Sequence, residues 1–180
     1  MISGPSGAGK GTLVTRVRER RSNLGLTVSA TTRAPRTGEV DGVNYFFLTR
    51  EEFDRRVANG EFVEWAEVHG NCYGTLVSEV QSKLASGASL ILEIDVQGAL
   101  QVKERFPEAV LIFIKPPSLE VLRERLVGRG TETPETIELR MANAADELAL
   151  ADRYDDVVVN DDLDRATDEL VRVLDMHERI

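Results

Sequence analysis

A glycine-rich loop at the start of the chain constrains the fold more than any other feature. It comprises Gly4, Pro5, Ser6, Gly7, Ala8, Gly9, Lys10, Gly11 and Thr12, and a helix-like stretch follows over residues 13–21. Glycines at this spacing let backbone amides turn inward around phosphate oxygens, and the N-terminus of the following helix adds positive charge. The pattern predicts a P-loop in which Lys10 reaches the β- and γ-phosphates of a nucleotide.

Two details of this loop depart from the usual pattern. Gly11 stands where a serine or threonine normally follows the lysine to bind Mg²⁺. Thr12 is therefore the candidate metal contact, and we expect phosphates and water to supply most of the ligands of the ion. Only residues 1–3 precede Gly4, whereas a P-loop normally follows a buried strand. We therefore expect a shortened first strand.

Apolar runs alternate with helix-like stretches along much of the chain. The runs cover residues 90–94, 109–114 and 157–159, and the helix-like stretches cover residues 77–85, 99–105, 119–127, 137–150 and 163–176. Short apolar runs are typical of parallel strands buried on both faces. The alternation predicts an α/β fold, a P-loop three-layer sandwich with a parallel central sheet. Ser118 and either Asp162 or Asp164 are candidate helix N-caps.

Two segments interrupt this alternation. Residues 29–75 carry turn residues, arginines and an aromatic run, which indicates an inserted lobe. Residues 128–149 begin with a stretch rich in glycine, threonine and charge, which favours a short lid. We expect one domain over residues 1–180, with its core at about residues 1–28, 76–127 and 150–180.

The composition argues against several other classes of protein. The formal net charge of −9 is unfavourable for wrapping nucleic acid, because a phosphate backbone needs a basic surface. Cys72 is the only cysteine, which excludes an internal disulfide and fits a reducing compartment. No run approaches the roughly 20 apolar residues of a membrane span. We expect a cytoplasmic protein with no nucleic-acid, membrane or obligatory protein partner.

Motifs beyond the P-loop extend over essentially the whole chain, and together they resemble guanylate kinase. They lie at residues 29–36, 38–42, 45–47, 64–65, 73–75, 93–98 and 128–131. The blocks at 29–36 and 93–98 are far more specific than a P-loop alone. The resemblance implies that ATP and Mg²⁺ are used to phosphorylate GMP to GDP in purine nucleotide metabolism, and it leaves the use of dGMP open.

The resemblance also implies a set of acceptor-site residues. GMP would be bound by Ser29, Arg33, Arg36, Tyr45, Glu64, Tyr73, Thr75, Glu93, Asp95 and Gly98. Guanine presents N1–H and an exocyclic amine as adjacent donors, so a carboxylate such as that of Glu64 suits its recognition. Arg33 and Arg36 provide planar donor forks for the acceptor phosphate.

On the donor side, the resemblance implies that Arg125, Asn160 and Asp161 bind ATP together with the P-loop. The catalytic residues would be Lys10, Arg36, Arg129 and Arg140, which spread the negative charge of the transition state. A strong general base is not needed, because the acceptor phosphate oxygen is largely ionised near neutral pH.

Other functions remain open at this point. Residues 9–12 also resemble the loop of adenylate kinase, so a kinase of another nucleoside monophosphate such as AMP is one alternative. A non-catalytic guanylate-kinase-like module that binds protein partners is a second. Such modules typically lose P-loop residues, whereas Lys10, Arg36, Arg129 and Arg140 are all present here. A purely structural α/β domain would leave these motifs unexplained.

Overall fold

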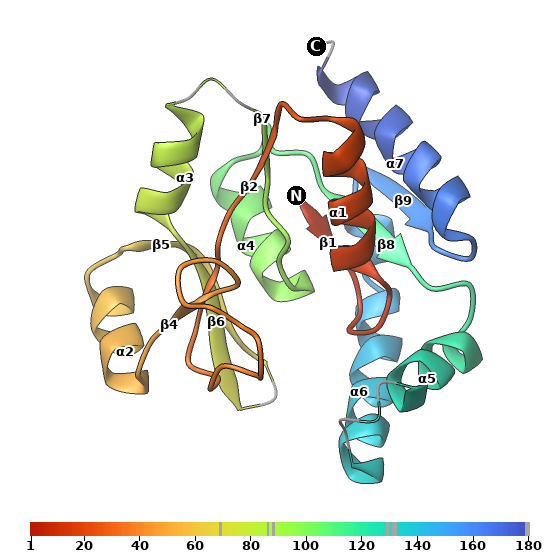
Figure 1. The fold of residues 1–180 in the computed structure, drawn as a ribbon, viewed down its shortest axis with the longest axis horizontal. Coiled ribbons are helices and arrows are strands. Elements are labelled where there is room, and N and C mark those ends of the chain that lie inside the picture. The colour runs from red at the N-terminus through yellow and green to blue at the C-terminus, as the bar shows by residue number, and fades with distance from the viewer. Residues whose placement is uncertain (69, 86, 88, 129, 131–132, 179–180) are drawn as a thin grey trace. The chain divides into compact units, whose positions relative to one another are not determined.

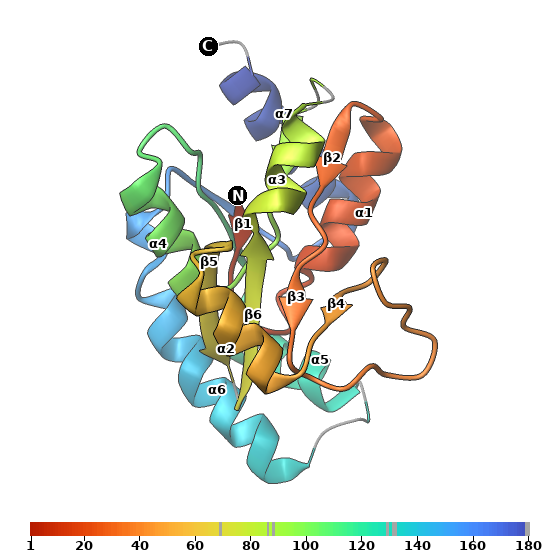
Figure 2. The same cartoon turned by 90° about the vertical axis from the view of Figure 1, so that its left-hand side faces the viewer.

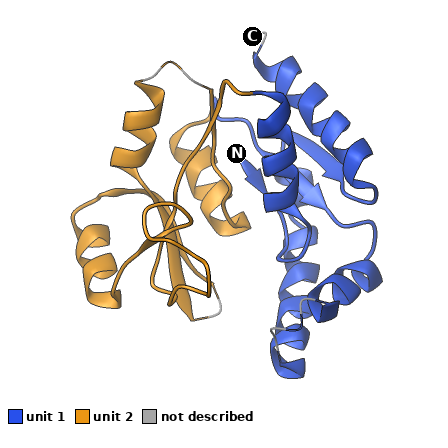
Figure 3. Ribbon diagram, viewed as in Figure 1, with its two compact units in different colours: residues 1–21, 108–180 blue, residues 22–107 orange. Residues whose placement is uncertain are grey.

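The computed structural model describes residues 1–68, 70–85, 87, 89–128, 130 and 133–178, and its contacts divide the chain into two compact units (Figure 3). Unit 1 comprises residues 1–21 and 108–180, and unit 2 comprises residues 22–107. The two units are defined by contacts within the chain and not by which residues are predicted to bind GMP or ATP. The lobe at residues 29–75 and the lid at residues 128–149 therefore stay predictions.

Unit 1 is built on a three-stranded parallel sheet with the order β1-β8-β9. Its strands are β1 (Ile2–Ser3), β8 (Ile112–Lys115) and β9 (Asp156–Val159). Its helices are α1 (Lys10–Arg20), α5 (Leu119–Gly128), α6 (Pro134–Leu148) and α7 (Leu163–Glu178), with a 3₁₀ turn at Ala151–Arg153. Both residues of β1 are buried, and they pair with Ile112 and Phe113 of β8.

Helix α1 follows the glycine-rich loop and buries Leu13, Val14 and Val17. Its opposite side carries arginines that pair with acidic residues of α7, and the two helices lie side by side (Figure 1). The pairs are Arg16 with Asp164, Arg20 with Asp168, and Arg21 with Asp175 and Glu178. These contacts join the helix that begins at Lys10 to the helix that follows β9.

Unit 2 contains two sheets. A parallel pair is formed by β2 (Leu24–Leu26) and β7 (Ser89–Ile91). A four-stranded sheet has the order β4-β3-β6-β5, with β4 at Phe46–Phe47, β3 at Ala30–Thr31, β6 at Asn71–Leu76 and β5 at Phe62–Val68. Its β3–β6 and β5–β6 pairs are antiparallel. The helices of this unit are α2 (Arg50–Ala58), α3 (Val77–Leu84) and α4 (Val96–Arg105).

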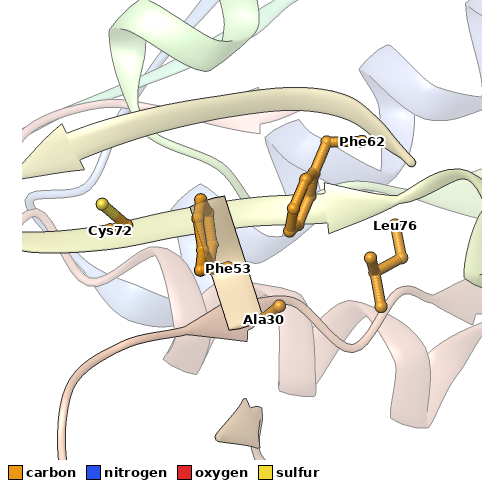
Figure 4. Close-up of a cluster of buried hydrophobic side chains, with 5 residues drawn as sticks. All are labelled: Ala30, Phe53, Phe62, Cys72 and Leu76. Carbon is orange, nitrogen blue, oxygen red and sulfur yellow. The ribbon is translucent and has the colours of Figure 1, made fainter. Parts of the chain in front are cut away.

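Helix α2 packs on the four-stranded sheet (Figure 2). Thr49 caps its N-terminus by accepting a hydrogen bond from the backbone N–H of Glu52. Phe53 is fully buried in a cluster with four residues of the sheet and stacks on Phe62 with ring centroids 4.5 Å apart. The cluster comprises Ala30, Phe53, Phe62, Cys72 and Leu76 (Figure 4). This small core holds β5 and β6 in place.

The structure confirms the predicted α/β class with parallel sheets and changes several boundaries. The second predicted strand, residues 109–114, lies at Ile112–Lys115, and the helix predicted to start at residue 137 starts at Pro134. The side chain of Ser118 accepts a hydrogen bond from the backbone N–H of Val121, as an N-cap does. The side chain of Asp162 accepts one from the backbone N–H of Arg165 in the same way. Each helix in the described ranges is too short or too polar to cross a bilayer.

Candidate active site

The P-loop joins β1 to α1 through glycines that no other residue can replace without strain. Gly4 has a φ of 137°, and a Cβ there would lie 2.2 Å from the carbonyl oxygen of Ile114. Gly9 has a φ of 90°, and a Cβ there would lie 2.3 Å from Nδ2 of Asn160. Both positions combine left-handed backbone with a close neighbour, which only glycine tolerates. The loop therefore depends on these residues for its shape.

Lys10 is folded back over the loop. Its Nζ donates hydrogen bonds to the carbonyl oxygens of Gly4 at 2.5 Å and Pro5 at 3.1 Å. Its charge is thus held against the carbonyl groups of the loop that precedes it. Thr12 is exposed in the first turn of α1, so its hydroxyl is accessible to an oxygen-ligated ion. Gly11 beside it offers no side chain.

Two residues predicted to bind ATP, Asn160 and Arg125, and the predicted catalytic residue Arg140 lie at the loop. Asn160 is buried, and its Nδ2 donates to the carbonyl oxygen of Ala8 at 2.8 Å. Arg125 donates from Nη2 to the carbonyl oxygen of Asn160 at 2.8 Å. Arg140 on α6 donates from Nη1 to Oγ of Ser6 at 2.5 Å. Unit 1 therefore brings three of its predicted polar residues to the P-loop.

The other two predicted donor-side residues are placed differently. The side chain of Asp161 pairs with Arg165, outside the contacts that hold the loop. A hydrogen bond from the backbone N–H of Asp162, together with that from Arg165, lowers the pKa of Asp161. Arg129, predicted to be catalytic, lies outside the described residues. The role of Asp161 in binding ATP and that of Arg129 in catalysis stay predictions.

In unit 2, Glu64 lies at a bulge in β5. Phe62 pairs with Leu76 and Glu64 pairs with Thr75. The chain therefore advances two residues along β5 for one residue along β6. A bulge redirects the side chains that follow it. Glu64 is only 4% exposed, and its Oε1 and the neighbouring Oγ1 of Thr75 are buried without a hydrogen-bond partner in the described part of the chain. Two oxygen atoms are thus left for a ligand that donates hydrogen bonds.

Helix α4 fixes the outer edge of β5. Gln101 exchanges hydrogen bonds with the backbone of Trp65, at 2.9 Å to its oxygen and 3.4 Å from its nitrogen. Arg105, one helical turn later, donates to the carbonyl oxygen of Val63 at 2.6 Å. Neither residue was among those predicted from the sequence. Their i, i+4 spacing on a helix next to an edge strand is the signal that could have found them.

The start of α4 approaches the Glu64 carboxylate directly. Asp95 is the N-cap of this helix and accepts the backbone N–H of Gly98 at 2.7 Å. A Cβ on Gly98 would lie 2.3 Å from Oε2 of Glu64, so glycine leaves room for the carboxylate. Burial raises the pKa of Glu64 to about 7. Side-chain and backbone donor groups of Thr75 near the carboxylate offset part of this rise, and the charge of Asp95 adds to it.

The predicted phosphate-side residues gather on β3, β6 and the adjoining loop. The Arg33 guanidinium lies 5.3 Å from the ring centroid of Tyr45, and the Tyr45 and Tyr73 rings are 6.1 Å apart. Burial raises the pKa of Tyr45, and the nearby Tyr73 and Glu93 raise it further. Arg36 is exposed, and its guanidinium makes no hydrogen bond within the described ranges.

Ser29 is half-buried just before β3. Its carbonyl oxygen accepts the backbone N–H of Phe46 at 2.9 Å. This bond satisfies the backbone carbonyl group of Ser29. The predicted contact of its hydroxyl with GMP stays a prediction.

Comparisons with known proteins show the family of this chain. The family model described as guanylate kinase matches residues 1–177. A guanylate kinase of Gloeobacter violaceus is 56% identical over 97% of this chain and 85% of its own length. One of Halalkalibacterium halodurans is 52% identical over the same shares. The crystal structure of guanylate kinase from Anaplasma phagocytophilum matches with a TM-score of 0.80 at 38% identity, covering 97% of this chain and 82% of that one.

The match covers both units, from the P-loop through the Glu64 region to α7. Sequence identities above half over nearly the whole chain are accompanied by a shared fold. This chain belongs to the guanylate kinase family.

Proposed function

We propose that this chain is an enzyme that transfers the γ-phosphoryl group of ATP to GMP, forming ADP and GDP. The observation that carries the choice of acceptor is the buried pair of unpartnered oxygens, Oε1 of Glu64 and Oγ1 of Thr75. Guanine brings two adjacent N–H donors to such a site, whereas adenine has no donor at N1. A base that leaves these oxygens unpaired pays a large penalty.

The chemistry needs alignment and charge more than acid–base groups. An oxygen of the acceptor phosphate bonds to the γ-phosphorus while the bond from that phosphorus to the bridging oxygen of ATP breaks. Lys10 and Arg140, which both contact the P-loop, are proposed to stabilise negative charge on the donor phosphates. Arg33 and Arg36 are proposed to bind the acceptor phosphate. Arg125, Asn160 and Asp161 are proposed to contact ATP as well.

A Mg²⁺ ion bound with ATP fits the available donors. The described residues contain no cluster of three or more His, Cys, Asp or Glu, so phosphate and water oxygens would supply most of its ligands. The exposed Thr12 hydroxyl is the protein group that would join them. When bound, the ion neutralises charge on the phosphates. We also propose a cytoplasmic location, which is supported by the buried free thiol of Cys72.

The direct test is ADP release from ATP and Mg²⁺ with GMP, dGMP, AMP, UMP and CMP supplied one at a time. We expect turnover with GMP and little with AMP, UMP or CMP. Equal rates with GMP and AMP would contradict the assignment of Glu64 and Thr75 to guanine recognition. A folded protein that turns over no acceptor would contradict the proposed activity itself.

A further inference from the structure

Glu39 was not among the predicted site residues, yet it contacts both arginines of the proposed acceptor-phosphate site. Its two carboxylate oxygens accept hydrogen bonds from Nη2 of Arg33 at 2.9 and 3.0 Å. Oε2 also accepts the backbone N–H of Arg36 at 2.7 Å. A single carboxylate thus ties the side chain of one arginine to the backbone of the other.

A tight turn brings Glu39 to this position. Its backbone N–H donates to the carbonyl oxygen of Arg36 at 3.0 Å, so the two residues exchange two hydrogen bonds. Gly38 between them has a φ of 87°, which is the left-handed conformation that glycine favours at the third position of a turn. The turn and the carboxylate therefore support each other, and the loop that carries Arg36 is fixed at its base.

The Arg33 guanidinium is held from several sides. Its side chain is 15% exposed and that of Glu39 is 19% exposed, so their charges are shielded from solvent. It lies near the rings of Tyr45 and Phe47, at 5.3 and 5.9 Å from their centroids. Nη1 donates to the carbonyl oxygen of Ala34 at 2.7 Å. Nε–H and one hydrogen on Nη1 take no part in these bonds. The hydrogen bond to Glu39 raises the pKa of Arg33, and the Tyr73 side chain also approaches the guanidinium closely enough to raise it.

We propose that Glu39 is a positioning residue for the acceptor phosphate, an inference that rests on the proposed function. It holds Arg33 in the orientation in which its remaining N–H groups bind phosphate oxygens. It also fixes the backbone from which the exposed Arg36 side chain extends. Ordering the Arg33 side chain and the Arg36 backbone before the phosphate arrives reduces the entropy lost on binding.

A competing role for Glu39 predicts the opposite result. A carboxylate bound to Arg33 occupies donors that a phosphate could use. If competition were dominant, removing the charge would tighten binding of GMP. If positioning is dominant, removing the charge weakens it. Steady-state kinetics therefore separate the two roles.

The experiment compares wild type with Glu39→Gln in the full chain. It measures kcat, the KM values for GMP and ATP, and the inhibition constant of guanosine, which lacks the phosphate. We expect the KM for GMP to rise about tenfold, as for the loss of one hydrogen bond to a charged group. The KM for ATP, the kcat and the guanosine constant should stay unchanged. A merely structural role would alter guanosine binding as well.

Two further variants serve as controls for Glu39→Gln. Glu52 on α2 also pairs with two arginines, Arg55 and Arg56, so Glu52→Gln is a matched control that should leave the KM for GMP unchanged. Glu39→Asp retains the carboxylate and should fall between wild type and Glu39→Gln. If circular dichroism shows that Glu39→Gln does not fold, Glu39→Asp is tested with the same expected direction.

The outcomes are distinct. A GMP constant that is unchanged or lower in the variant would overturn the positioning role, and so would equal weakening of GMP and guanosine. Wild-type protein that does not phosphorylate GMP would overturn the proposed function, and this inference with it. Wild-type turnover combined with an unaffected Glu39→Gln variant would overturn this inference alone.

Discussion

The P-loop of unit 1 and the base site of unit 2 satisfy their polar groups in opposite ways. In unit 1 the Lys10 ammonium already donates to two carbonyl oxygens of its own loop. In unit 2 the buried Oε1 of Glu64 and Oγ1 of Thr75 have no hydrogen-bond partner in the described ranges. Under the proposed function, a nucleotide phosphate would exchange hydrogen bonds in unit 1, whereas a guanine base would add them in unit 2.

This difference assigns separate tasks to the two regions. Exchanged hydrogen bonds contribute little net free energy, so the P-loop must derive its effect from charge. Completing a buried, unpaired acceptor removes a penalty of about 1–3 kcal/mol, which only a ligand with the matching donor can do. Rate should therefore be most sensitive to cations of unit 1, and discrimination between bases to oxygens of unit 2.

The largest expected effect comes from Arg140→Ala. Loss of an arginine that stabilises transition-state charge should lower kcat about 10³-fold, with the choice between GMP and AMP unchanged. Rapid-quench or coupled ADP assays measure this. Arg123→Ala removes an exposed arginine of α5 that pairs with Glu138, and it serves as the matched control. A fall in base discrimination with Arg140→Ala would break the separation between the two regions.

Glu64→Gln should act on discrimination. The glutamine amide presents a donor towards a donor of guanine, and a charged acceptor is lost, so kcat/KM for GMP should fall about 10²-fold. The KM for ATP should not change. Glu67→Gln on the same strand removes an exposed carboxylate paired with Arg50 and should have no effect. Loss of ATP affinity in Glu64→Gln would contradict a role confined to the acceptor.

The pH dependence of base binding follows from the same carboxyl. Burial raises the pKa of Glu64 to about 7, so below that pH a protonated Glu64 offers guanine a hydroxyl donor. The inhibition constant of guanosine should therefore rise up to about tenfold per pH unit below 7. Guanosine is used because it has no phosphate that titrates in this range. A flat profile between pH 5.5 and 8 would argue for an ionised carboxylate throughout.

The free energy of unfolding of the ligand-free protein should also depend on pH through Glu64. The folded pKa of Glu64 lies above its ordinary value of 4.5, so folding takes up a proton between the two. The stabilisation from this group is complete below pH 4.5 and is lost as the pH rises through 7. Thermal unfolding of Glu64→Gln should lack this decline.

The smallest expected effect is that of Gly98→Ala. The new Cβ would lie 2.3 Å from Oε2 of Glu64, and the end of that side chain would have to shift. A local overpacking cost of about 1 kcal/mol should raise the KM for GMP about fivefold and leave the KM for ATP unchanged. Gly60→Ala, where the φ is 70° and a Cβ would meet no atom within 4 Å, strains the backbone away from Glu64 and should leave the KM for GMP unchanged. Equal effects of the two substitutions on the KM for GMP would show that Gly98 does not influence base binding through Glu64.

The sequence predicted what depends on local pattern. The P-loop, the alternation of strands and helices, and the N-caps at Ser118 and Asp162 all follow from residue types at fixed spacing. The bulge before Glu64 did not follow, because one extra residue in a strand leaves no mark on composition. The contact between Glu39 and Arg33 was also missed, since it depends on how the turn at Gly38 closes.

Trp65 gives the molecule an internal reporter. It is the only tryptophan of the chain, it directly follows Glu64, and its ring is partly exposed and meets Phe53 edge-on at 6.3 Å. Its emission therefore arises from unit 2 alone. Under the proposed function, GMP bound beside Glu64 should change this emission, so a fluorescence titration of the unlabelled protein would follow binding of the acceptor.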